Sequence, residues 1–451
     1  MTTDTTTAKR GFHFKDITKM FGGGGTSTLR QFGILGSLIV IIVLFEILTL
    51  IRNGPNGATL TSGNLINVIN QYSFILILAI GMVMVIIMGH IDLSVGSVAA
   101  FTGIIVAKSM QDWSLPWPLA ILLGLAVGAA VGAWQGFWVA YVGVPAFIVT
   151  LAGMLLFRGA QQWIGDAQTI PVPKGFQIIG TGYLPEIGLP LPFNVPTMLL
   201  ALVAVAWLVF FEIRTRRVQH KMGSESAPLW VSITKVVLLS VVVLVAAWMF
   251  ATGRPGTSFP VPGLILLALV ILYTFVTSKT VFGRHIYAVG GNRQAARLSG
   301  VKDRWVDFFV MMNMSVLAAL AGMIFVARSQ ASGPNDGTGW ELDAIASVFI
   351  GGAAVAGGIG TVIGSIIGGL VMAFLNNGLA LLGQGADVVS MIKGIVLLFA
   401  VGIDVWNKQQ GRPSLIGFMT RRFGRQVDPA TETFEPNKTY QAPPVDKTSG
   451  K

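Results

Sequence analysis

The residues best suited to chemistry in this chain lie in a polar segment that interrupts a long apolar stretch. It reads His90-Ile91-Asp92-Leu93-Ser94-Val95-Gly96-Ser97. A carboxylate at membrane depth costs a few kcal/mol, so it faces protein or water rather than lipid. Asp92 and Ser94 therefore have two interpretations. They either cap the helix that follows, or they contact a polar solute on a path through the membrane.

Two neighbouring amides, Asn376 and Asn377, form a second candidate site near the end of another apolar run. They could hydrogen-bond the hydroxyl groups of a solute, or they could hold two helices together. Glu341 and Asp343 begin a further apolar run, where acidic side chains favour a helix N-terminus. For these two residues we expect a capping role.

The motifs of common catalytic sites are missing from the sequence. There is no Gly-x-x-x-x-Gly-Lys-Ser/Thr loop for ATP and no His-Glu-x-x-His pair for a metal. There is no Gly-x-Ser-x-Gly turn and no cysteine for a nucleophile. We therefore expect no catalytic residue, cofactor or metal on this chain, and a function other than that of an enzyme.

The composition is that of a membrane protein: 53% of residues are hydrophobic and 11% are charged. Apolar runs of about 20 residues, each long enough to cross about 30 Å of hydrocarbon, recur along the chain. The fold class expected is an all-α, polytopic membrane bundle of about 10–12 transmembrane helices. The candidate spans are 33–51, 65–88, 93–109, 118–141, 145–164, 196–212, 230–251, 259–277, 307–327, 343–361, 362–382 and 388–406.

Lysine and arginine concentrate in four places, which lie on one side if the candidate spans alternate. These are the N-terminal tail 1–32, the loop after residue 212, the segment 278–306 and the tail 407–451. The positive-inside rule makes that side cytoplasmic, with both termini there. The domains expected are therefore two cytoplasmic tails and a transmembrane domain, 33–406, that contains an accessory hairpin, 196–251. The pair 65–88 and 93–109, or the pair around 343–382, could instead be re-entrant.

The 55 glycines include two notable blocks. One runs from Gly351 to Gly369, and the other repeats every four residues at Gly124, Gly128, Gly132 and Gly136. Small residues permit close helix contact in lipid, which favours packing for both blocks. For 351–360 the alternative is unwound backbone that lines a cavity.

Segment 278–306 is a polar, basic island between two apolar runs. Its middle predicts a short helix from Asn292 to Leu298, with Asn292 as N-cap and Gly300 as C-terminal stop. A protein that only holds a solute needs no such helix, whereas one driven by a soluble partner does.

Several segments together resemble sugar-importing ABC transporter permeases of the xylose and ribose class, over about residues 33–195 and 255–406. They are Gly89-His90-Ile91-Asp92-Leu93-Ser94-Val95-Gly96-Ser97, Val144-Pro145-Ala146-Phe147-Ile148-Val149-Thr150-Leu151-Ala152-Gly153, Phe282-Gly283-Arg284 to Gly290-Gly291-Asn292, Ala295-Ala296-Arg297-Leu298-Ser299-Gly300, Glu341-Leu342-Asp343-Ala344-Ile345-Ala346 and Phe374-Leu375-Asn376-Asn377-Gly378. Ribose-type members commonly have glycine where this chain has His90. They also lack a counterpart of 196–251, which looks more like the longer xylose and multiple-monosaccharide permeases.

The resemblance implies an inner-membrane permease that works as a pair, with a periplasmic sugar-binding protein outside and ABC ATPase subunits in the cytoplasm. ATP and magnesium would bind on the ATPase. The general coupling signature, Glu-Ala-Ala and a distant glycine, has Gln294-Ala295-Ala296 and Gly300 as its counterpart here. The coupling residues expected are Gly290, Asn292, Ala295, Ala296, Arg297, Leu298, Ser299 and Gly300. The alternatives are a branched-chain amino-acid ABC permease and an ion-coupled secondary transporter.

Overall fold

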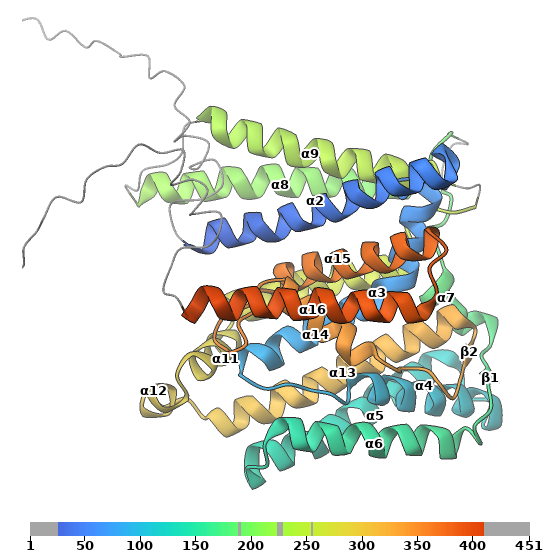
Figure 1. Cartoon of the computed structure of the whole chain (residues 1–451), viewed down its shortest axis with the longest axis vertical. Coiled ribbons are helices and arrows are strands. Elements are labelled where there is room, and N and C mark those ends of the chain that lie inside the picture. The colour runs from blue at the N-terminus through green and yellow to red at the C-terminus, as the bar shows by residue number, and fades with distance from the viewer. Residues whose placement is uncertain (1–25, 188–190, 223–228, 254–255, 410–451) are drawn as a thin grey trace, which may run out of the picture. The chain divides into compact units, whose positions relative to one another are not determined.

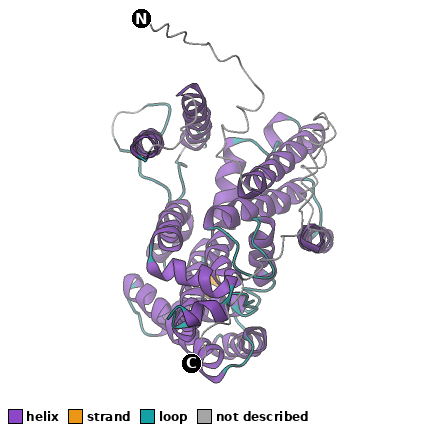
Figure 2. Ribbon diagram, turned by 90° about the vertical axis from the view of Figure 1, so that its left-hand side faces the viewer, coloured by secondary structure: helices purple, strands orange, loops and turns teal. Residues whose placement is uncertain are grey.

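The computed structural model describes residues 26–187, 191–222, 229–253 and 256–409. Most of this part of the chain is helical, which confirms the all-α membrane class (Figure 2). Most of the two terminal tails, predicted to be cytoplasmic, falls outside the described residues. The helices are α2 (Thr26–Asn53), α3 (Ser62–Ile87), α4 (Val95–Asp112), α5 (Trp117–Phe137), α6 (Ala146–Ile164), α7 (Lys174–Thr181), α8 (Val195–Lys221), α9 (Leu229–Ala251), α10 (Val261–Lys279), α11 (Val281–Gly291), α12 (Arg293–Leu298), α13 (Asp303–Ser329), α14 (Trp340–Ile350), α15 (Val362–Leu381) and α16 (Ala386–Gln409). A 3₁₀ turn, η1 (Pro55–Gly57), and a π-helical turn, η2 (Trp138–Val142), complete the helical elements.

Nine helices of the described part are long and apolar enough to cross a membrane. Two of the twelve expected spans differ from the prediction in an informative way. Residues 343–361 do not form one helix, because α14 ends at Ile350 and 351–361 are non-helical. Gly352, Gly357 and Gly358 in this stretch have positive φ, which a continuing α-helix does not allow. The span expected at 93–109 corresponds to α4, which has 18 residues but is not among the nine long, apolar helices.

Helix α13 is the centre of the bundle, with α3, α4 and α5 packed on it (Figure 1). The glycines of α5 face it directly. A Cβ added at Gly132 would lie 2.6 Å from Cα of Met312, and one at Gly136 would lie 2.9 Å from the carbonyl oxygen of Phe308. The four-residue glycine repeat is therefore a packing surface that lets two backbones approach closely.

Helix α4 begins part of the way along α13 rather than at its end. A Cβ at Gly322 would meet the carbonyl of Ala99, and one at Gly103 would meet Val326, so α4 and α13 run parallel. The start of α4 at Val95 therefore lies beside the middle of α13. At about 1.5 Å per residue, it is about 22 Å from the start of α13, which is about 40 Å long. The preceding residues 88–94 are non-helical and connect the end of α3 at Ile87 with this start of α4.

Helix α14 begins beside the first turn of α4. A Cβ at Gly337 would lie 2.0 Å from the carbonyl oxygen of Gly96, and a Cβ at Gly96 would lie 2.7 Å from Oε2 of Glu341. The two short helices therefore bring their N-termini together at mid-depth and run toward opposite ends of the bundle. Segments 88–94 and 333–339, which precede these half-helices, are non-helical, and residues 334–339 form turns in which Gly337 and Gly339 have positive φ.

The glycine-rich stretch 351–361 packs where α3 and α11 end. Its Gly358 N–H donates to the carbonyl of Ile87 at 2.8 Å, and the Tyr287 hydroxyl donates to the carbonyl of Gly360 at 2.7 Å. The unwound backbone that the glycines predicted is present. Its glycines contact neighbouring backbone, so close packing is the use that the structure gives them.

The opposite end of the bundle carries α7 and a small antiparallel pair of strands. Strand β1 (Ile170–Pro171) pairs with β2 (Ala331–Ser332), next to the end of α13. Helices α8 and α9 form a hairpin whose two arms contact each other, and Lys235 lies 3.3 Å from Glu212 between them. The accessory role of this hairpin stays a prediction.

Candidate functional site

The short helix predicted in the basic island is α12, and its ends are capped as the sequence indicates. Asn292 accepts a hydrogen bond from the Ala295 N–H at 3.0 Å. At the other end Gly300 has φ +85°, and the N–H groups of Gly300 and Val301 donate to Arg297 and Ala296. This pair of bonds is a Schellman C-cap, which requires the left-handed conformation that glycine adopts most readily.

The faces of α12 differ in what they offer to a partner. Leu298 is 90% exposed, and Ala295, Arg297 and Ser299 are also exposed. Ala296 is buried within its own chain, with 5% of its surface accessible. Ala295 and Leu298 could therefore contact a partner directly, whereas Ala296 supports the helix from inside.

Gly290, another of the expected coupling residues, lies against the end of α3. A Cβ at this position would overlap the carbonyl of Ile87, at 1.8 Å from its oxygen. Only glycine permits this approach without a shift of the backbone. Gly290 therefore packs α11 against α3, and its role in coupling stays a prediction.

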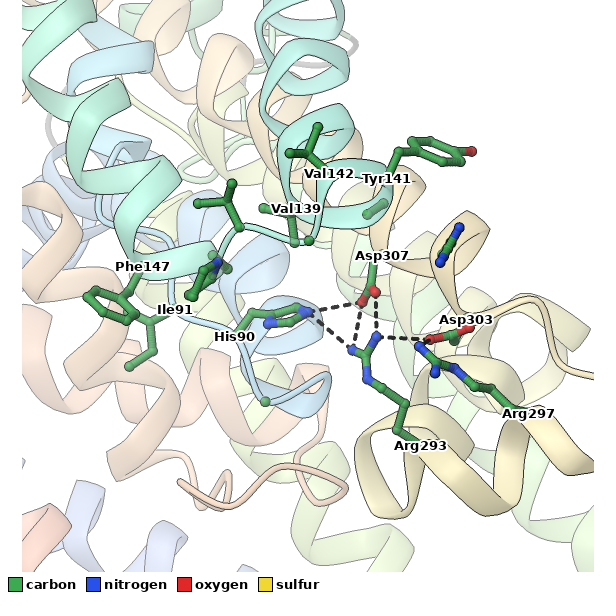
Figure 3. A pocket seen from close by; sticks show the side chains of 17 residues that line it. His90, Ile91, Val139, Tyr141, Val142, Phe147, Arg293, Arg297, Asp303 and Asp307 are labelled. Atoms are coloured by element: carbon green, nitrogen blue, oxygen red, sulfur yellow. Dashed lines mark hydrogen bonds and ion pairs between the residues drawn. The ribbon is translucent and has the colours of Figure 1, made fainter.

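A network of charged side chains connects α12 with α13 and with the extended segment 88–94 (Figure 3). Nη1 and Nη2 of Arg293 donate to the two carboxylate oxygens of Asp307 at 2.5 and 2.9 Å. Asp303 accepts from Arg293 at 3.1 Å and from Arg297 at 2.6 Å. The hydrogen bond with Asp307 raises the pKa of the Arg293 guanidinium above its usual value. A pair of parallel hydrogen bonds between an arginine and a carboxylate fixes the relative orientation of the two side chains and also adds to the energy of their interaction.

His90 joins this network from the other side. Its Nε2 lies 3.0 Å from Oδ1 of Asp307 and 3.3 Å from Nη2 of Arg293. The His90 side chain is 19% exposed and that of Asp307 only 4%. The His90–Asp307 end of the network therefore lies inside the protein, where solvent screens it less than an exposed pair, whereas the Arg297 side chain is 55% exposed.

The network borders a cavity of about 520 Å³ at the α12 end of the bundle (Figure 3). Segment 89–91, residues 139–147 between α5 and the first turn of α6, and Arg304 at the start of α13 complete its wall. Charged groups line one side and apolar groups such as Val142 and Phe147 line the other.

Asp92 and Ser94 belong to a buried polar cluster at the start of α4. Oδ1 of Asp92 accepts from the N–H of Ser94 at 2.8 Å and from its hydroxyl at 2.6 Å. Gln135 of α5 donates to the Ser94 hydroxyl oxygen at 2.7 Å. Oδ2 of Asp92 is buried without a hydrogen-bond partner among the described residues. The structure thus shows the hydrogen bonds between Asp92 and Ser94, and a contact of Asp92 with a solute stays a prediction.

The amides Asn376 and Asn377 lie at the end of α15 away from α12. Asn377 exchanges two hydrogen bonds with Asn64 of α3, at 2.8 and 3.0 Å. Asn376 is buried, and its Oδ1 has no partner within the described part of the chain. These two residues are therefore remote from Asp92 and Ser94 along the bundle, and their place on a solute path stays a prediction.

Two features of the site were not predicted from the sequence: the contact between His90 and Asp307, and the direction of the Glu341 side chain. His90 and Asp307 are 217 residues apart, and the sequence offered no sign that they meet. Glu341 was expected to cap α14, yet its Oε2 points at the first turn of α4 and has no hydrogen-bond partner in the described structure. The exceptional histidine in the Gly-His-Ile-Asp-Leu-Ser segment was the signal that could have drawn attention to His90.

Comparison with known proteins gives one consistent family. The model of the family described as "Branched-chain amino acid transport system / permease component" matches residues 64–401. The xylose transport system permease protein of Haemophilus influenzae is 40% identical over 383 residues, which is 85% of this chain and 98% of that protein. No solved structure matches this chain.

Two further relatives agree with the first. The xylose transport system permease protein of Escherichia coli K12 is 36% identical over 392 residues, 86% of this chain and 95% of that protein. The ribose import permease protein of the same organism is 35% identical over 374 residues, 83% of this chain and 94% of that protein. With its membrane-spanning helices, the chain is a multi-pass inner-membrane transport subunit and not an enzyme. It belongs to the matched permease family and, within that family, to the sugar ABC permeases of the xylose and ribose class.

Proposed function

We propose that this chain forms the translocation path of an ATP-driven importer for a monosaccharide of the xylose, arabinose, galactose or glucose type. The named relatives carry xylose or ribose and align over most of this chain. The family description refers to branched-chain amino acids, but these curated relatives are sugar permeases. They favour a sugar over the amino-acid alternative.

The exposed helix α12 is the single observation that carries the coupling part of the proposal. It is a separate, capped helix whose Leu298 is 90% exposed and whose surface is otherwise basic and polar. An apolar side chain on a short exposed helix fits a groove on a soluble partner. In this proposal the partner is a cytoplasmic ABC ATPase, which binds ATP and magnesium, while this chain binds neither.

The half-helices α4 and α14 support the transport part of the proposal. Discontinuous helices that meet near the midplane are a common way to build a solute site in a transporter. Asp92 and Glu341 each keep one buried carboxylate oxygen without a partner among the described residues. Such oxygens are suited to accept hydrogen bonds from the hydroxyls of a passing sugar.

Partners and orientation follow from the same proposal. Two copies of the chain would surround the path, a periplasmic sugar-binding protein would dock at the end that carries β1 and β2, and the α12 end would face the cytoplasm. Arg214, Arg216, Arg217 and Lys221 near the end of α8 and the basic residues of 278–306 support this orientation. Both termini would then be cytoplasmic.

The test is reconstitution with a cytoplasmic ABC ATPase and a periplasmic sugar-binding protein. We expect sugar uptake that requires ATP, and co-purification of the ATPase that is lost in Leu298→Glu. Val281→Glu is the matched control, because Val281 is also exposed in the basic island but lies on α11. Uptake that runs on an ion gradient without ATP would instead support the secondary transporter.

Unchanged ATPase binding by Leu298→Glu would remove α12 from the coupling role. Ala296→Glu is unsuitable for this purpose. Ala296 is buried, so the substitution would disturb the packing of α12 on its own chain as well as any interface.

A further inference from the structure

Helix α12 is attached to the rest of the chain by very few side chains. It has six residues, of which only Ala296 is buried. Arg293, the first residue of the helix, supplies its strongest side-chain contacts, namely the two bonds to Asp307 and the third to Asp303. Arg297 adds a bond to Asp303 at 2.6 Å, so a displacement of α12 acts on Asp307 through the Arg293 guanidinium and on Asp303 through both arginines.

His90 places the extended segment 88–94 on the same carboxylate. The imidazole lies 3.0 Å from Oδ1 of Asp307, while Oδ2 of that carboxylate accepts from Arg293. Segment 88–94 is not helical, and it is also linked to α6 and α5: the Thr150 hydroxyl donates to the carbonyl of Ile91 at 3.3 Å, and Gln135 donates to the Ser94 hydroxyl oxygen at 2.7 Å. Asp92 follows His90 by two residues in the same segment, and α4 begins three residues later, at Val95.

We propose that His90 is a positioning residue that transmits movement of α12, through Arg293 and Asp307, to segment 88–94 and to the mid-depth start of α4. The inference rests on the proposed coupling of α12 to an ATPase, and it assigns the route within this chain. Movement of α12 toward or away from α13 changes the Arg293–Asp307 pair. His90, which shares Oδ1 of Asp307, then moves the extended segment that holds the Asp92 carboxylate. An extended segment follows such a shift more readily than a packed helix, because it has no internal hydrogen-bond ladder to break.

The first experiment measures sugar transported per ATP hydrolysed in reconstituted membranes. His90→Ala should lower this ratio by at least about fivefold, the lower end of typical allosteric couplings, while ATPase co-purification stays normal. His90→Gln should recover most of the ratio, because its amide can donate to Asp307. His285→Ala is the matched control, since His285 lies on α11 in the same basic island and takes no part in the network. A wild-type ratio in His90→Ala would overturn the inference.

A loss of ratio by His90→Ala that His90→Gln does not relieve would also count against it, because the hydrogen bond would then not be the cause. A double-mutant cycle adds a second criterion. Arg293→Ala and His90→Ala act on one route, so the double variant should be no worse than Arg293→Ala alone. Simply additive losses would place the two residues on separate routes and overturn the inference.

The second experiment follows movement directly and separates this inference from the proposed function. The chain has no cysteine, so single cysteines can serve as reporters. Ser299→Cys reports α12, and Ile91→Cys, at a position 36% exposed, reports segment 88–94. In the assembled transporter, ATP should change the maleimide-labelling rate of both reporters. With His90→Ala added, only the Ser299→Cys reporter should still respond.

Each remaining outcome has one meaning. If the Ser299→Cys reporter never responds to the ATPase or to ATP, the proposed coupling role of α12 fails, and this inference fails with it. If both reporters respond equally with and without His90, α12 is coupled but His90 is not the connection.

Discussion

Asn64 on α3 and Asn377 on α15 exchange a pair of side-chain hydrogen bonds. Nδ2 of Asn64 donates to Asn377 at 2.8 Å, and Nδ2 of Asn377 donates back at 3.0 Å. Asn64 also donates to the carbonyl of Thr59 at 2.8 Å. Both side chains are buried, so the pair joins the two helices at the end of the bundle remote from α12.

The first prediction concerns this pair. Asn377→Leu should lower the free energy of unfolding by about 1–3 kcal/mol, because the buried amide of Asn64 loses its partner. The measurement is unfolding in a mild detergent titrated with sodium dodecyl sulfate. The double variant Asn64→Leu/Asn377→Leu should regain part of the loss, since no unpaired amide is left between the helices. Lost sugar uptake at unchanged stability would favour the solute-path role for Asn377 instead.

The glycine repeat of α5 gives a second prediction. Gly132→Ala should destabilise the bundle by about 1–3 kcal/mol, because its Cβ would overlap the backbone of Met312 on α13. Gly159→Ala on α6 is the matched control: a Cβ there meets nothing within 4 Å, and alanine favours the helix. The same detergent titration compares the two. Equal stability of both variants would show that α5 and α13 do not depend on this close approach.

The sequence predicted local features of the site much better than its long-range contacts. The caps of α12 follow from Asn292 and Gly300, whose side-chain oxygen and conformational freedom act within a few residues. The charge network could not be predicted in this way, because Arg293 meets His90 across 203 residues of sequence. Only the folded bundle brings them together.

The wrong span at 343–361 has a related cause. Its hydropathy is that of a membrane helix, and glycine is tolerated inside such helices, so the glycines of 351–360 indicated an unwound backbone only as an alternative to helix packing. The contacts of Gly358 with Ile87 and the positive φ values decide the local structure, and both depend on tertiary neighbours. The start of α4 part of the way along α13 could not be predicted for the same reason, because it also depends on tertiary neighbours.

A third prediction addresses the two interpretations of Asp92. Asp92→Asn retains an oxygen that can accept from Ser94 and should leave stability within about 1 kcal/mol, whereas Asp92→Leu should cost about 1–3 kcal/mol. The structural reason is that Oδ1 of Asp92 holds both the N–H and the hydroxyl of Ser94. Stability and sugar uptake are measured for both variants at matched expression. Equal loss of uptake in both, at normal stability, would show that the path requires the charge itself.

The last prediction concerns an ion pair between two helices in the apolar part of the chain. Nζ of Lys393 on α16 lies 2.9 Å from both carboxylate oxygens of Asp343 on α14. The Asp343 side chain is 14% exposed and that of Lys393 28%. The two residues are 50 positions apart in the sequence, so this partner is a finding of the structure. Removal of one member of a buried pair leaves a charge without compensation and can cost about 3–5 kcal/mol.

Lys393→Met should therefore lower the free energy of unfolding by about 1–3 kcal/mol, less than for a fully buried pair because solvent still reaches Lys393. Asp343→Asn/Lys393→Met should be more stable than Lys393→Met alone, since it removes both charges. Lys108→Met is the control, because the ion pairs of Lys108 with Asp112 and Asp166 are more exposed, and its loss should stay within about 0.5 kcal/mol. Detergent unfolding distinguishes the three variants. If Lys393→Met behaves like Lys108→Met, water screens the Asp343 carboxylate in the membrane, and the pair does not hold α14 to α16.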